Sequence, residues 1–136
     1  MIESKINIIL NYFKVGNFKY VIKETTKLSN KNPNNSYLKN LLGLAYLETG
    51  AKIQAVENFN LAIKLNPKNI SALNNLGNAY KYLNKYEKAE KFYLRALKLN
   101  PDFIDALNNY GNLKYNINQS QEAITLLNKA LSINEK

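Results

Sequence analysis

The sequence contains no cysteine and no histidine in its 136 residues. Without them there can be no disulfide bond, and no thiolate or imidazole ligand for a metal. The Ser–His and Cys–His pairs of nucleophilic enzymes are excluded for the same reason, and no glycine-rich phosphate loop is present. The carboxylates, Glu90 and Glu122 among them, are expected at turns and on exposed helix positions, with no pair spaced for acid–base catalysis. We therefore predict a chain that is not an enzyme and that needs no metal and no cofactor.

Long apolar runs are also missing. No stretch of about 18 apolar residues occurs, so we expect no helix that spans a membrane. The first ten residues, MIESKINIIL, carry a short apolar cluster, but Asn7 interrupts it. They lack the basic start and the small-residue cleavage site of a secretory signal. A cytoplasmic location, with no membrane partner, is the expectation.

Acidic residues are scarce relative to basic ones, with 10 against 19 and a formal net charge of +9. Such a balance can indicate binding to nucleic acid or to an anionic surface. Here almost all of the positive charge is lysine, Arg95 is the only arginine, and the lysines are dispersed without a block. Together with abundant Asn, Ile and Tyr, this dispersion favours the composition bias of an AT-rich genome, and a functional basic surface is the alternative.

Glycine and proline are few, at five and three residues, but most of them recur at an interval of 34 residues. A constant spacing of this size is typical of a repeat array. We divide the chain into repeats of about 2–35, 36–69, 70–103 and 104–136, which form one domain over residues 1–136. Five columns share a spacing of 34 residues: Gly43, Gly77 and Gly111; Ala55, Ala89 and Ala123; Ala62, Ala96 and Ala130; Pro33, Pro67 and Pro101; Tyr12, Tyr46 and Tyr80.

This pattern resembles the tetratricopeptide repeat (TPR), in which a small residue, glycine, aromatic residues, alanines and proline follow one another over 34 residues. The resemblance implies an all-α fold, a right-handed α-solenoid superhelix of four antiparallel helix pairs. Each pair consists of a helix A and a helix B. Repeat three matches the pattern best, through Leu73, Leu76, Gly77, Tyr80, Ala89, Tyr93, Ala96 and Pro101.

Repeat one departs from this pattern, because Ile9 stands in the glycine column and Thr25 in an aromatic column. Its apolar spacing predicts helices near 3–15 and 18–31. Lys114 likewise replaces the tyrosine expected in repeat four.

Several turn residues carry local predictions. Gly50 and Asn84 suit the left-handed conformation at the end of a helix A. Asn35 or Ser36 is expected to cap the next helix, and Asp102 is expected to be an N-cap as well.

The resemblance implies a protein–protein interaction scaffold that binds a peptide segment of a partner on its concave side, which the A helices line. Two asparagine-rich A helices suggest a row of amides that holds the main chain of an extended peptide. The row resembles, at Asn75 and Asn109, the asparagine ladder of the O-linked N-acetylglucosamine transferase superhelix. An equally open explanation is that asparagine is simply abundant. The predicted peptide-binding residues are Asn74, Asn75, Asn78, Asn108, Asn109 and Asn112, with Leu44, Tyr82 and Tyr115 for apolar contact.

Some members of this family hold the C-terminal tails of heat-shock chaperones with a carboxylate clamp of lysine, arginine and asparagine. No cation stands at the matching positions of this chain, so we predict no such clamp. Begun at repeat two, these positions hold Asn40, Leu44, Asn75, Asp105 and Asn109; begun one repeat earlier, they hold Ile6, Leu10, Leu41, Ser71 and Asn75.

Two other functions remain open. The chain could be the substrate-recruiting N-terminal module of a larger enzyme of the glycosyl- or sulfotransferase type. RNA binding, as in other helical repeats, is less expected because the concave columns carry few cations.

No capping helix follows repeat four, and Leu126, Leu131 and Ile133 lack an evident partner. Such an end indicates a piece of a longer protein, self-association through the last helix, or a frayed helix.

Overall fold

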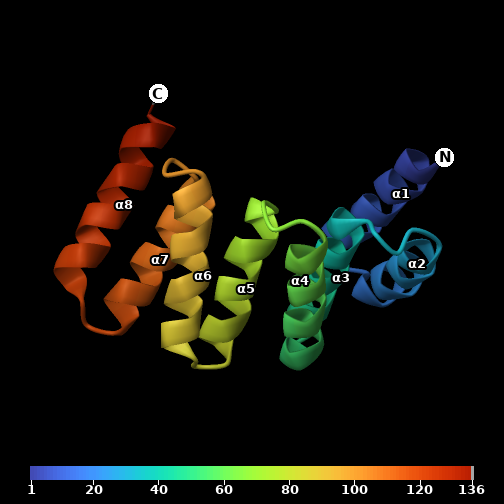
Figure 1. Ribbon diagram of the computed structural model, residues 1–136, viewed down its shortest axis with the longest axis horizontal. Helices are drawn as coiled ribbons and strands as arrows, with labels where there is room; N and C mark the ends of the chain where they lie inside the picture. The colour runs from blue at the N-terminus through green and yellow to red at the C-terminus, as the bar shows by residue number, and fades with distance from the viewer. Residues whose placement is uncertain (136) are drawn as a thin grey trace. The chain divides into compact units, whose positions relative to one another are not determined.

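A computed structural model describes residues 1–135 of the chain (Figure 1). In this range all regular secondary structure is helical, which confirms the all-α prediction. The two helices predicted for repeat one are confirmed to within one residue. The eight helices are α1 (Ile2–Lys14), α2 (Phe18–Lys31), α3 (Ser36–Glu48), α4 (Lys52–Leu65), α5 (Ile70–Tyr82), α6 (Tyr86–Leu99), α7 (Ile104–Asn116) and α8 (Ser120–Asn134).

The helices form two compact units, Met1–Ala72 and Leu73–Lys136, which we describe separately. In the first unit, α1 packs against α2, α2 against α3, and α3 against α4. In the second unit, α6 packs against α7, and α7 against α8. Helix α5 begins at Ile70 in the first unit and continues into the second.

Each helix A (α1, α3, α5 and α7) is followed, two residues after its end, by a left-handed residue that turns the chain toward helix B. Gly50 has a φ of 82°, and Asn84 and Asn118 have φ values of 60° and 64°. The predictions for Gly50 and Asn84 are therefore confirmed. Asparagine serves at two of these turns because it tolerates the left-handed region better than other residues with a Cβ.

The helix starts differ more from expectation. Asn35 caps α3, since its Oδ1 accepts a hydrogen bond from the Leu38 N–H at 3.0 Å, as predicted. The prediction for Asp102 is wrong, because the N-cap of α7 is Phe103, which makes no side-chain cap. Asn100 closes the preceding turn by accepting from the Asp102 N–H at 3.0 Å, so the helix starts one residue later than expected.

A small residue opposite a large one sets the distance between the helices of a pair. A Cβ built on Gly43 would lie 2.6 Å from the ring of Phe59, and one built on Gly77 would lie 2.6 Å from the ring of Tyr93. In repeat one the sizes are reversed, with buried Ile9 in the glycine column and buried Thr25 in the ring column. The two departures therefore preserve the combined volume of the pair.

The apolar cores follow this arrangement within each unit. In the first unit, Ile9, Val21 and Leu28 of repeat one pack with residues of α3. In the second unit, Tyr93 and Ala89 of α6 pack with residues of α7. Leu126 of α8 also packs against this second cluster, so the expectation that it lacks a partner is wrong.

Candidate functional site: the amide surface

The second unit carries asparagines on both of its A helices. Asn74 and Asn78 lie four residues apart on α5, and Asn108 and Asn112 lie four apart on α7, so each pair shares one helix face. Asn75 and Asn109 are the next residue of each helix. We call these six residues the amide surface.

Two hydrogen bonds orient amides of this surface. The Nδ2 of Asn109 donates to the Oδ1 of Asn74 at 3.1 Å, which links α7 to α5. The hydroxyl of Tyr93, on α6, donates to the Oδ1 of Asn78 at 2.5 Å. Burial raises the pKa of the Tyr93 hydroxyl, and the nearby Tyr82 adds to the effect, so the hydroxyl remains a donor. Both bonds consume carbonyl oxygens and leave an NH₂ group on Asn74 and Asn78.

The six amides differ in exposure. Asn74 and Asn75 are buried, at 5 % and 9 % exposure, and Asn78 and Asn109 are intermediate. Asn108 and Asn112 are exposed. The amide surface therefore has a buried row on α5 and an exposed row on α7, a division that the sequence pattern did not predict.

The three residues predicted for apolar contact are divided between the units. Tyr82, the last residue of α5, and Tyr115, near the end of α7, are 51 % and 66 % exposed. Leu44 lies on α3 in the first unit and is half-buried. Two large exposed aromatic side chains thus belong to the same helices as the amides.

The chemistry available on the amide surface is neutral hydrogen bonding. Each carboxamide offers two N–H donors and one carbonyl acceptor, which match the C=O and N–H groups of an extended peptide main chain. Aromatic side chains such as Tyr82 and Tyr115 add apolar area with little loss of conformational entropy. The surface has no titratable nucleophile or acid–base pair of its own.

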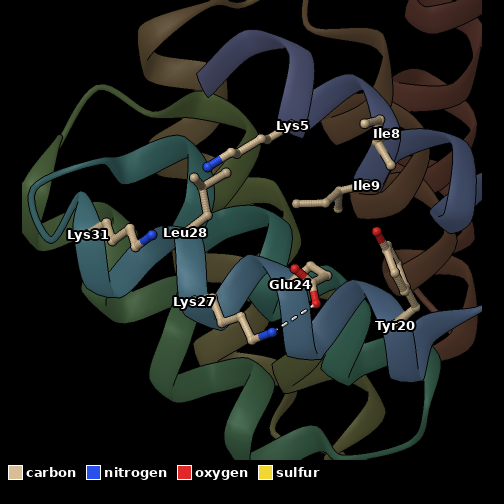
Figure 2. A pocket seen from close by; sticks show the side chains of 8 residues that line it. All are labelled: Lys5, Ile8, Ile9, Tyr20, Glu24, Lys27, Leu28 and Lys31. Carbon is tan, nitrogen blue, oxygen red and sulfur yellow. Dashed lines mark hydrogen bonds and ion pairs between the residues drawn. The ribbon is translucent and has the colours of Figure 1, made fainter. Parts of the chain in front are cut away.

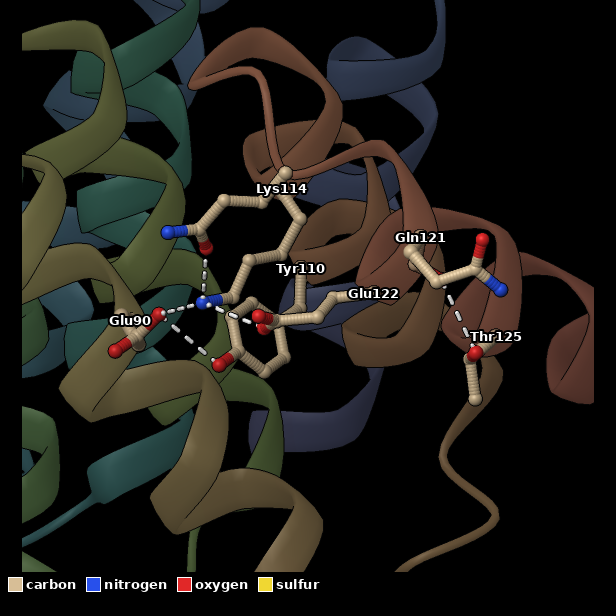
Figure 3. Close-up of polar contacts among 7 residues, drawn as sticks. Glu90, Tyr110, Lys114, Gln121, Glu122 and Thr125 are labelled. Carbon is tan, nitrogen blue, oxygen red and sulfur yellow. Dashed lines mark hydrogen bonds and ion pairs between the residues drawn. The ribbon is translucent and has the colours of Figure 1, made fainter.

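A charged cluster that sequence reasoning missed lies on α6, α7 and α8 (Figure 3). The buried Lys114 ammonium lies 2.6 Å from a carboxylate oxygen of Glu90 and 3.0 Å from one of Glu122. It also donates to the Oε1 of Gln119 at 2.7 Å, and the hydroxyl of Tyr110 donates to Glu90 at 3.0 Å. The expectation that Glu90 sits at an ordinary exposed position is therefore wrong. The one sequence feature that indicated this cluster is Lys114, which stands in a column where a tyrosine is expected.

The pKa values in this cluster shift as an ion pair requires. Hydrogen bonding to Glu90 raises the pKa of Lys114 despite the opposing effect of burial, and the same contact lowers the pKa of Glu90. Burial and the bond to Glu90 raise the pKa of the Tyr110 hydroxyl. All three groups keep their ordinary neutral-pH charges, so we assign the cluster to packing between helices.

Among residues 1–135, no group of three or more potential acidic or sulfur ligands is placed to hold a metal ion. In the same range, no helix has both the length and the apolar character needed to cross a bilayer.

Comparison with known protein families identifies the repeats. Profiles of the tetratricopeptide repeat match residues 70–103 and 92–125, and a TPR repeat profile matches residues 43–83. The chain therefore belongs to the tetratricopeptide-repeat family, a class of protein-interaction modules. A comparison with proteins of curated function gives no match.

Solved structures share the fold. A crystal structure of MamA superimposes with a TM-score of 0.85 at 24 % identity, covering 98 % of this chain and 78 % of that one. The first TPR of Spaghetti (RPAP3), bound to the HSP90 peptide SRMEEVD, superimposes with a TM-score of 0.80 at 28 % identity, covering 85 % of this chain and 92 % of that one. The likeness to MamA shows the fold alone.

Proposed function

We propose that this chain is a non-catalytic scaffold that binds an extended segment of a partner protein on the amide surface. In this proposal Asn108 and Asn112 make hydrogen bonds to the main chain of the segment. Tyr82 and Tyr115 pack against its side chains.

The observation that carries the proposal is the hydrogen bond from Asn109 to Asn74. It joins amides of two successive A helices, so that donors and acceptors from α5 and α7 lie side by side. This bond and the bond from Tyr93 to Asn78 hold Asn74, Asn78 and Asn109 in place, so these three amides lose little side-chain entropy when a ligand binds.

The similarity to the RPAP3 structure supports a peptide as the ligand, since that TPR is bound to an HSP90 peptide. The mode of binding proposed here is different. The positions of the carboxylate clamp lack a cation in this chain, so a terminal carboxylate would have no charged partner there. Neutral amides bind a main chain without selecting its side chains, so we expect an internal, extended segment rather than a chain terminus.

The test is a selection of peptides from a random library on the full-length chain. The strongest binder is then measured against the Asn108→Ala, Asn112→Ala double variant. Both residues are exposed, so truncation should not disturb folding. Two lost hydrogen bonds at about 1 kcal/mol each should weaken binding by about tenfold or more.

The matched control is the Asn128→Ala, Asn134→Ala double variant. It removes two exposed asparagines of α8 in the same unit and should bind the selected peptide with unchanged affinity. Equal affinity of both double variants and the original chain would refute the amide surface as the binding site. So would failure of the library to yield a binder.

A further inference from the structure

A groove of about 180 Å³ lies between α1 and α2 in the first unit (Figure 2). Its floor is apolar, with Ile8 and Ile9 from α1 and Leu28 from α2. Three lysines stand around it. Tyr20 and Glu24 complete the lining.

The repeat register indicates what shape of ligand this groove accepts. Ile8 of repeat one occupies the same column as Tyr110 of repeat four. In the second unit α6 packs over that column, since the rings of Tyr93 and Tyr110 lie 6.0 Å apart and Tyr110 bonds to Glu90. Tyr110 is accordingly 7 % exposed, whereas Ile8 is 50 % exposed. The surface on which this fold packs a helix is therefore open on α1.

The charge of the groove indicates the chemistry of that ligand. The groove is lined by three lysines, Lys5, Lys27 and Lys31, and by one carboxylate, Glu24, which pairs with Lys27 at 3.3 Å. Figure 2 shows the three ammonium groups toward one side of the groove and Ile8 and Tyr20 toward the other. The groove thus combines a basic edge with an apolar floor.

We infer that this groove binds an acidic amphipathic helix of a partner protein. The apolar face of the helix would cover the exposed Ile8, next to the buried Ile9 and Leu28. Its carboxylates would pair with Lys5 and Lys31. This site is separate from the amide surface, because it lies on other helices and in the other unit.

A second copy of the chain is a poorer occupant. Helix α8 exposes Ile124 and Leu131, which could enter an apolar groove. However, basic residues outnumber acidic ones in both units, by ten to four over residues 1–72 and by nine to six over residues 73–136. Two such surfaces repel each other, whereas an acidic helix is attracted.

The test uses a fluorescent designed peptide of about five helical turns, with leucines along one face and glutamates on both flanks. Its anisotropy is measured with the full-length chain and with the Lys5→Glu, Lys31→Glu double variant. We expect the charge reversals to weaken binding by about tenfold or more, and salt to weaken binding to the original chain. The control variant, Lys64→Glu with Lys68→Glu, makes the same charge change on exposed lysines of the same unit outside the groove. It should change affinity by less than about threefold.

Two companion measurements separate the apolar floor from charge alone. A matched peptide with lysines in place of the glutamates should not bind. The Ile8→Ser variant, confirmed as folded by circular dichroism, should bind the acidic peptide more weakly although the charge is unchanged.

The inference is overturned if the acidic peptide binds no more tightly than about 1 mM, or equally well to the Lys5→Glu, Lys31→Glu variant. Displacement of the peptide by a single-stranded RNA that binds with higher affinity through the same lysines would assign the groove to phosphate instead. A concentration-dependent dimer in light scattering, abolished by the same double variant, would assign it to a second copy of the chain.

Discussion

Replacing Gly77 by alanine tests the packing of a helix pair most sharply. A Cβ at this position would lie 2.6 Å and 2.7 Å from the Cε1 and Cδ1 atoms of Tyr93. Tyr93 cannot easily retreat, because it is completely buried and its hydroxyl bonds to Asn78. Alanine stabilises a helix by about 1 kcal/mol relative to glycine, whereas overpacking destabilises by about 1–3 kcal/mol. We expect a net loss of about 0–2 kcal/mol in the free energy of unfolding.

The assay is a double-mutant cycle with Tyr93→Val, followed by urea denaturation. Valine removes the ring atoms that the new Cβ would meet, so Gly77→Ala should become neutral or stabilising in that background. The coupling energy should be about 1 kcal/mol or more. Because loss of the ring itself destabilises the core, all four proteins are measured in the same concentration of sucrose.

Two results would show that the Tyr93 ring does not impose glycine at position 77. Gly77→Ala could stabilise the chain by the full gain in helix propensity, which would mean that the ring moves at no cost. Alternatively, Gly77→Ala could change stability equally with tyrosine or valine at position 93, which would mean that contact with the ring is not the reason for glycine at position 77.

Three further predictions concern the charged cluster and a turn. Lys114→Met leaves Glu90 and Glu122 without their cation, and urea denaturation should show a loss of about 1–2 kcal/mol in the free energy of unfolding. The loss is smaller than for a fully buried pair, because the two carboxylate side chains are 35 % and 61 % exposed. The contact with Lys114 holds the pKa of Glu90 below its ordinary value of 4.5. The stability that this ion pair contributes is therefore complete above pH 4.5 and is lost as the pH falls through the lowered pKa. The Lys114→Met variant should lose less stability on acidification than the original chain. Asn84→Ala places a Cβ-bearing residue without a polar side chain at a φ of 60° and should lower stability by about 1 kcal/mol, whereas Asn84→Gly should not.

Much of the fold could be predicted because it depends on residues that recur every 34 positions. Glycines such as Gly77 and turn residues such as Asn84 act through backbone geometry and through contacts within one repeat, and such residues recur in most repeats of the sequence. The start of α7 was missed, because Asp102 and Asn100 compete for the same turn and only Asn100 closes it.

The candidate sites could be predicted only in part. Helical spacing places the asparagines on common faces, but it does not say that Asn74 is buried and bonded while Asn108 is exposed. The lysines appear dispersed along the chain, yet Lys5 and Lys31 line one groove because α1 and α2 pack together. The ion pair of Lys114 with Glu90 likewise joins residues of different repeats.

In the proposed function, amides of α7 hold the main chain of a peptide. The most direct measurement is a ¹⁵N NMR titration of the full-length chain with the library-selected peptide, following the side-chain NH₂ signals of asparagine. We expect the signals of Asn108, Asn109 and Asn112 to shift in proportion to occupancy, while those of Asn128 and Asn134 on α8 stay in place. Saturable binding that leaves the first three signals unmoved would contradict it.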